Sequence, residues 1–112
     1  FDDVKDDFTI MKQEPFGPLC PMLSFKTFDE VIERSNNHEL GLASYICTNS
    51  MEQAHRASEL IETGTVAVNT PLVAIAEAPF GGIKQTGYGR EGGSIAIKDY
   101  LNIKYTHLGI KG

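Results

Sequence analysis

The spacing of apolar residues predicts three helices in the first two thirds of the chain. In segment 5–14, Phe8 and Met11 lie three positions apart, and Asp6 or Asp7 can cap the helix. Two further helices, 28–36 and 51–61, each begin with a capping box, in which a hydroxyl residue precedes a Glu or Gln by three positions. The boxes are Thr27 with Glu30 and Ser50 with Gln53.

The helix 51–61 is expected to bury one face. Its apolar stripe consists of Met51, Ala54, Ala57, Leu60 and Ile61. Gly64 is expected to end this helix, because glycine readily takes the left-handed conformation that closes many helices.

Short apolar runs between the helices predict strands at 19–25, 42–47 and 65–69. Pro21 favours an edge position for the first of these. A helix at 94–100 and a final strand at about 103–110 complete the order. Strands that alternate with helices imply crossover connections, so we predict an α/β fold with a mainly parallel sheet.

Composition and charge exclude some classes of function. The chain has 112 residues, 41% of them apolar, and a net charge of −5, with no Lys/Arg cluster. This pattern argues against nucleic-acid binding, and no apolar run reaches the roughly 18 residues that a membrane span needs. A cytoplasmic protein is therefore expected. The chain begins without Met, at Phe1, which we interpret as a segment of something longer.

A glycine-rich loop, 79–93, is the most unusual stretch of the sequence. Within 78–93 lie six of the 11 glycines, together with Phe80, Ile83 and Tyr88, which flexible linkers lack. The string Gly87–Gly92 matches G-x-G-x-x-G, but a dinucleotide fingerprint follows a strand directly and is followed by an acidic residue about 20 positions later. Neither condition is met here, so the glycines are interpreted as structural.

Cysteine and histidine side chains offer no catalytic or metal-binding pattern. Cys20 and Cys47 lie in apolar strand-like runs and are expected to fill the core. Three histidines are scattered, at positions 38, 55 and 107. No catalytic residue and no metal ligand is therefore predicted.

Glu14 is the more informative candidate. It stands directly before the rigid turn Pro15-Phe16-Gly17-Pro18. A carboxylate there can accept hydrogen bonds, and an aromatic ring on a fixed turn can lie against a planar group. The alternative is a surface Glu in a salt bridge beside a packing Phe.

Several blocks of the sequence, in this order, resemble the C-terminal quarter of the NAD(P)-dependent aldehyde dehydrogenase family. They are Glu14–Pro18, Gly41–Tyr45, Val68-Asn69, Pro79–Glu91 and Asp99–Tyr105. Pro-Phe-Gly-Gly-Ile-Lys and the Tyr-Leu-Asn-Ile-Lys-Tyr tail are most similar to those of succinate-semialdehyde dehydrogenases. The resemblance implies that 1–102 is the C-terminal part of a catalytic domain and that 103–112 is an oligomerisation arm.

The resemblance also implies roles for individual residues. Glu14 corresponds to the glutamate that binds the nicotinamide-ribose hydroxyls of NAD or NADP, and Phe16 to the aromatic that packs by the nicotinamide. Segment 70–78 corresponds to the substrate-access loop, with Phe80 lining the aldehyde tunnel. Homo-oligomers would form through the final strand.

Two departures from the family pattern matter. Neither Cys20 nor Cys47 lies in the motif of the catalytic cysteine, whose thiolate attacks the aldehyde before hydride transfer and thioester hydrolysis. The segment alone is therefore predicted to be inactive. The resemblance makes succinate semialdehyde a candidate substrate. Ala74, however, replaces a serine that helps to hold the substrate carboxylate in succinate-semialdehyde dehydrogenases, and loop 70–78 has no cation, so a less polar aldehyde is a second candidate. The alternative function is a non-catalytic interaction module derived from the family.

Overall fold

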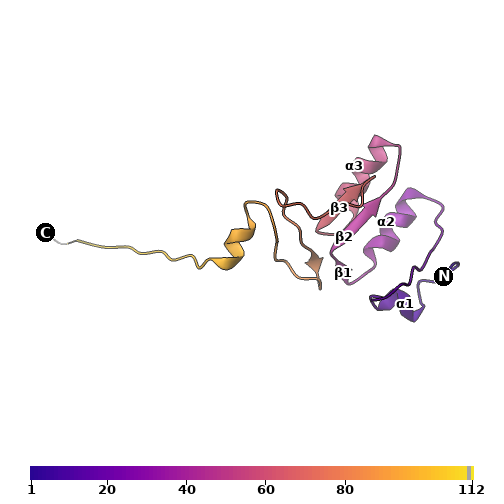
Figure 1. The fold of residues 1–112 in the computed structure, drawn as a ribbon, viewed down its shortest axis with the longest axis horizontal. Coiled ribbons are helices and arrows are strands. Elements are labelled where there is room, and N and C mark those ends of the chain that lie inside the picture. Colours follow the sequence, from indigo (N-terminus) through magenta and orange to yellow (C-terminus); the bar gives the residue numbers. More distant parts are fainter. Residues whose placement is uncertain (111) are drawn as a thin grey trace. The chain divides into compact units, whose positions relative to one another are not determined.

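The computed structural model describes residues 1–110 and 112, and Lys111, inside the predicted arm, lies outside the described residues. The chain divides into two units. The first comprises 1–39 and 48–62, and the second comprises 40–47 and 63–112. Figure 1 labels their helices and strands.

The first unit contains helices α1 (Thr9–Lys12), α2 (Phe28–Asn36) and α3 (Met51–Leu60). The capping residues of α2 and α3 are as predicted: the Thr27 and Ser50 hydroxyls accept hydrogen bonds from the Glu30 and Gln53 amides, at 3.2 and 3.3 Å. The Glu30 carboxylate also accepts a hydrogen bond from the Lys26 amide, at 2.8 Å. The Asn36 side chain links the helices by donating to the Leu60 carbonyl and accepting from the Glu62 amide.

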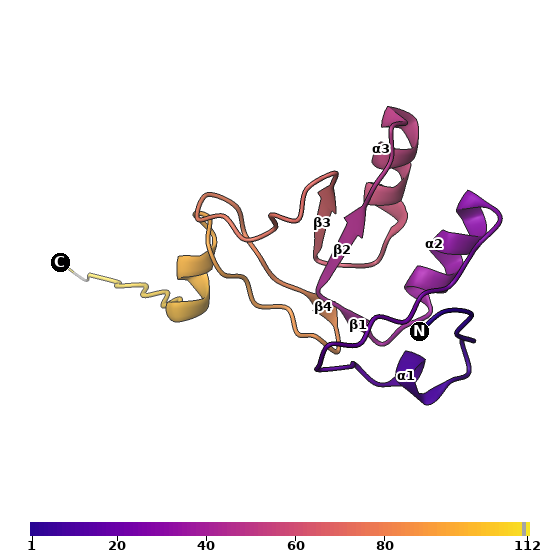
Figure 2. The ribbon, with the colours of Figure 1, turned by 45° about the vertical axis from the view of Figure 1, so that its right-hand side comes forward.

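The second unit contains two small sheets, which Figure 2 shows from a second direction. Strands β2 (Ala43–Ile46) and β3 (Thr65–Val68) pair in parallel, with Ala43 opposite Thr65 and Ile46 opposite Val68. Strands β1 (Leu40–Gly41) and β4 (Ile83–Lys84) pair antiparallel. Parallel pairing is thus limited to β2 and β3 among the described residues, instead of running through the sheet as predicted.

Two predicted elements of the first unit are wrong or shortened. No strand forms at 19–25: Pro18 and Pro21 lack amide donors, and the Ser24 carbonyl accepts from the Arg34 side chain instead of a neighbouring strand. Helix 5–14 shrinks to the single turn α1. Asp6 does not cap it, because its carboxylate pairs with Arg34.

Of the two elements predicted near the end of the chain, the helix is corrected, and the arm strand stays a prediction because its partner would be another subunit. The helix expected at 94–100 is a 3₁₀ helix, η1 (Ala96–Tyr100). Residues 101–110 contain no strand, and this segment is the yellow trace after η1 in Figure 1. Its apolar side chains are exposed, Ile103 completely.

The buried apolar core of the described residues is small. It consists of Val4, Ala54, Ala57 and Ala67, so the inward face of α3 is as predicted only at its alanines. Met51 is 84% exposed, and both Cys20 and Cys47 are exposed, so the prediction that the cysteines fill the core is wrong. Large apolar side chains are exposed in both units, among them Phe16, Tyr88 and Ile103.

Gly64 has a different role from the one predicted. Helix α3 ends at Leu60, and its C-cap, Ile61, is extended (φ −75°, ψ 126°), so Gly64 does not close the helix. Instead, a Cβ on Gly64 would collide with the carbonyl oxygen of Gly81. Glycine is required there because two stretches of backbone lie in direct contact.

Candidate functional site

The predicted cofactor residues lie in the first unit, on the loop between α1 and α2. Glu14 and Phe16 are both exposed, and the Phe16 side chain is 93% accessible. Within the described part of the chain, Glu14 has no hydrogen bond or ion pair, so the alternative of a salt-bridged Glu14 is not seen. The turn after it is fixed by a 2.8 Å bond from the Leu19 amide to the Gly17 carbonyl. The loop therefore presents an unpaired carboxylate and an uncovered aromatic ring two positions apart.

The predicted substrate residues lie in the second unit. Loop 70–78 starts after Asn69, which has a left-handed backbone (φ 55°) and whose amide donates to the Ile46 carbonyl. Short-range bonds then shape the loop, from the Leu72 amide to the Thr70 hydroxyl and from the Ala78 amide to the Ile75 carbonyl. Ala74 lies between these two turns and is exposed. The loop thus presents mainly apolar groups.

Phe80 is held at both of its backbone groups. Its amide donates to the Glu91 carbonyl at 2.7 Å, and its carbonyl accepts from the Glu91 amide at 2.8 Å. The ring is half-buried. Residues 80 and 91 therefore close the glycine-rich loop at its base and fix the direction in which Phe80 points.

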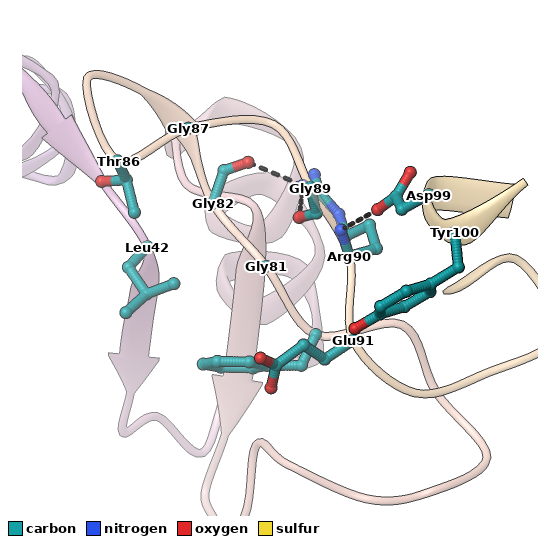
Figure 3. Close-up of a pocket in the computed structure, with 11 residues that line it drawn as sticks. Leu42, Gly81, Gly82, Thr86, Gly87, Gly89, Arg90, Glu91, Asp99 and Tyr100 are labelled. Carbon is teal, nitrogen blue, oxygen red and sulfur yellow. Dashed lines mark hydrogen bonds between the residues drawn. The ribbon is translucent and has the colours of Figure 1, made fainter. Parts of the chain in front are cut away.

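Arg90 holds the interior of the same loop. Its guanidinium nitrogen Nη1 donates to the carbonyls of Gly82, Tyr88 and Gly89, at 2.7, 3.0 and 3.0 Å. Its backbone amide donates to the Asp99 carboxylate at 2.9 Å, a contact drawn in Figure 3. One side chain thus gathers three carbonyls that no strand partner satisfies, and η1 is attached through Asp99.

Glycine is needed at two points of this loop because other atoms lie directly against its backbone. A Cβ on Gly81 would collide with the carbonyl of Gly89, and one on Gly82 would collide with the Thr86 side chain. Thr86 in turn accepts a hydrogen bond from the Gly41 amide at 2.9 Å. The loop is therefore joined to β1 by close contacts that leave no room for side chains at 81 and 82.

A pocket of about 370 Å³ opens beside Phe80 in the second unit. The pocket is lined by the residue between β1 and β2, by the glycine-rich loop and by η1. Figure 3 draws these residues: Leu42, Phe80, Gly81, Gly82, Thr86, Gly87, Gly89, Arg90, Glu91, Asp99 and Tyr100. Sequence reasoning identified Phe80 but missed Arg90 and Asp99. An arginine within a glycine-rich run was the available signal, because unpaired loop carbonyls need a donor.

Among the described residues there is no cluster of three or more His, Cys, Asp or Glu side chains that could hold a metal ion. No helix in the described part of the chain combines the length and the apolar character that crossing a bilayer requires.

The chain belongs to the aldehyde dehydrogenase family, whose model matches residues 1–106. It is 46% identical over 107 residues to a mitochondrial succinate-semialdehyde dehydrogenase of Arabidopsis thaliana, covering 96% of this chain and 20% of that protein. It is 43% identical over 108 residues to the NADP⁺ succinate-semialdehyde dehydrogenase of Escherichia coli, covering 96% of this chain and 22% of that protein.

A solved structure gives the same result. The aldehyde dehydrogenase from Bacillus cereus in complex with NAD⁺ matches with a TM-score of 0.90 and 44% identity, over 98% of this chain and 22% of the other. The chain thus spans about a fifth of the length of the relatives it matches. The name of the E. coli relative gives NADP⁺, and the B. cereus structure is a complex with NAD⁺, in agreement with the NAD or NADP expected from the sequence.

Replacing Arg90 with Met should loosen the glycine-rich loop, because three carbonyls lose their shared donor. Hydrogen exchange of the Phe80 and Glu91 amides is expected to become at least about tenfold faster. Lys98→Ala, an exposed change on η1, is the matched control and should leave both rates unchanged. Equal exchange in Arg90→Met and the parent protein would show that the guanidinium does not hold the loop.

Proposed function

We propose that this chain is the C-terminal part of an NAD(P)⁺-dependent aldehyde dehydrogenase that oxidises an aldehyde to its carboxylic acid. The observation that carries the proposal is the match to the family model over residues 1–106, with the Glu14-Pro15-Phe16-Gly17-Pro18 motif inside it. The small core and large exposed apolar surface also suit a segment that other protein covers. A cytoplasmic location stays a prediction.

Glu14 and Phe16 are proposed to bind the nicotinamide end of the cofactor. The Glu14 carboxylate would accept hydrogen bonds from the ribose hydroxyls, and it needs to lose no partner within the described chain before doing so. The Phe16 ring would pack beside the nicotinamide. An interaction module would need neither group, which favours the enzyme over that alternative.

Ala74 and Phe80 are proposed to contact the aldehyde. Phe80 would form an aromatic wall, fixed in direction by its two hydrogen bonds to Glu91. Loop 70–78 offers Leu72, Val73, Ala74 and Ile75 but no Lys or Arg, and its only charge is the acidic Glu77. Since a carboxylate without a donor is costly to bury, the loop favours an uncharged aldehyde over succinate semialdehyde.

The catalytic nucleophile would come from outside residues 1–112. Cys20 and Cys47 lie outside the catalytic motif, so this segment would contribute cofactor placement, part of the substrate tunnel and subunit contact. Expressed alone, it should not oxidise aldehydes.

Residues 103–110 are proposed to join a neighbouring subunit. Ile103 and Tyr105 are exposed on a run whose backbone pairs with nothing in the described chain. Apolar side chains on an unpaired extended segment favour addition to the edge of another sheet.

Glu14→Gln in the complete protein that carries this chain tests the function. The KM for NAD(P)⁺ should rise about tenfold or more, because hydrogen bonds to a charged acceptor are worth more than those to a neutral amide. Glu33→Gln, an exposed glutamate on α2, is the control. Complete protein that oxidises no aldehyde with either cofactor would instead support the interaction module.

The substrate preference is tested by comparing kcat/KM for hexanal and succinate semialdehyde. We expect the complete protein to favour hexanal, and Ala74→Ser to raise kcat/KM for succinate semialdehyde about tenfold by adding a donor. Ala76→Ser, on the same loop, should have no such effect. A parent protein that already favours succinate semialdehyde would contradict this assignment.

The subunit contact is tested with Ile103→Glu. A charge at a buried position of the interface should lower the molar mass measured by light scattering, whereas Lys104→Glu at the neighbouring polar position should not. The arm assignment fails if Ile103→Glu retains the parent mass at micromolar concentration.

A further inference from the structure

Arg34, on α2, ties together two points of the chain that flank the proposed cofactor residues. Its Nη2 donates to the Asp6 carboxylate at 2.8 Å, and its Nη1 donates to the Ser24 carbonyl at 2.9 Å. Glu14 and Phe16 both lie between Asp6 and Ser24 in the sequence. One guanidinium therefore closes the loop that presents them.

The Arg34 guanidinium is itself held in position by a carboxylate on the same helix. The Glu30 carboxylate, one turn earlier on α2, accepts from Arg34 at 3.3 Å and from the Lys26 amide at 2.8 Å. The Lys26 hydrogen bond, and then the charge of Arg34, hold the pKa of Glu30 below its ordinary value. The hydrogen bond to Asp6, above all, raises the pKa of Arg34. Both groups are thus charged at neutral pH.

Two further hydrogen bonds hold the loop near its end, from the Phe1 amine to the Cys20 carbonyl at 3.0 Å and from the Met22 amide to the Phe1 carbonyl at 2.8 Å. Apolar burial adds little to them. No residue from 5 to 25 is buried, and the only helix within it is the single turn α1. The Arg34 side chain is 29% exposed, and like Ile10 and Leu23 it is half-buried. Its polar contacts therefore act together with the backbone hydrogen bonds to Phe1 in holding a loop that has no buried residue.

The chemistry of arginine suits this task. The planar guanidinium presents several donors in fixed directions, so it can reach a carboxylate and a carbonyl at once. A lysine ammonium has a single nitrogen and no such fork. Closing a loop at its ends lowers the number of conformations open to the residues inside it, and a preformed site loses less entropy when a ligand binds.

The loop between α1 and α2, which carries Glu14 and Phe16, is called the cofactor loop below. We propose that Arg34 is a positioning residue for the cofactor loop: by bridging Asp6 and Ser24, it holds Glu14 and Phe16 in place to bind the nicotinamide ribose. This inference rests on the proposed function of these two residues. Arg34 itself does not touch the cofactor, and it acts on binding rather than on the chemical step.

The test is Arg34→Met in the complete protein, with NAD⁺ and NADP⁺ as probes. Losing both contacts should raise the KM for the cofactor about tenfold while kcat stays within about twofold. Amides of residues 13–22 should exchange faster, and those of α3 should not. Arg34→Lys, which keeps the charge but reaches one partner, should fall between Met and the parent.

Arg56→Met is the matched control. Arg56 lies in the same unit, pairs with Asp29 at 3.6 Å and stands 4.6 Å from the centre of the Phe28 ring, but contacts nothing in the cofactor loop. Its removal deletes a similar charge and ion pair, so the KM for the cofactor should not change.

The possible outcomes distinguish a failure of the role proposed for Arg34 from a failure of the cofactor role proposed for Glu14. If Glu14→Gln raises the KM and Arg34→Met does not, Arg34 is not a positioning residue, and the cofactor assignment stands. If Glu14→Gln has no effect, the cofactor assignment fails and the inference fails with it. Should Arg34→Met not fold, Asp6→Ala decides: it removes one end of the bridge, and an unchanged KM and loop exchange would overturn the proposal.

Discussion

The second unit depends on backbone that approaches backbone without a side chain in between. Gly64 lies against the Gly81 carbonyl, and Gly81 lies against that of Gly89. Gly82 in addition leaves room for the Thr86 side chain. These contacts bring segments that are distant in sequence within reach of the hydrogen bonds that join them, from the Gly41 amide to Thr86 and from the Thr65 hydroxyl to Gly81. The close packing of these glycine backbones therefore fixes the position of Phe80 and of the pocket beside it.

In each unit, hydrogen bonds from an arginine side chain hold the conformation of a loop that has little apolar burial. With four small or medium side chains in the buried core, apolar packing cannot define the loops. Arg90 collects three carbonyls of the glycine-rich loop, and Arg34 joins a carbonyl and two carboxylates around the loop of Glu14. In each case a fork of donors fixes a turn of backbone that has no strand partner. The residues proposed to meet ligands are carried on these loops, whereas the helices and strands supply their anchors.

The parts of the fold that could be predicted are those encoded locally. The Thr27 and Ser50 caps locate α2 and α3 within about a residue, and apolar runs locate β2 and β3, because each signal lies inside the element it describes. The strand at 19–25 failed because its apolar residues suggested pairing while the Ser24 carbonyl bonds to a side chain. The helix predicted at 5–14 is shorter because the Asp6 carboxylate binds Arg34 instead of capping the helix.

For the site, the motif itself pointed to Glu14, and the family resemblance assigned Phe16, Ala74 and Phe80. Arg34 and Arg90 were missed because the direction of a loop carbonyl is set by the fold, not by residue type.

The contacts of Arg90 have a practical consequence for labelling the protein. Its guanidinium recognises main-chain oxygen at positions 82, 88 and 89, so it is indifferent to which side chain stands at 88. Once the exposed Cys20 and Cys47 have been replaced, the exposed Tyr88 can be exchanged for a cysteine that carries a dye, while the carbonyl of position 88 stays bound to Arg90. A probe at this position would report, from its exposed side, on the state of the loop that carries Phe80.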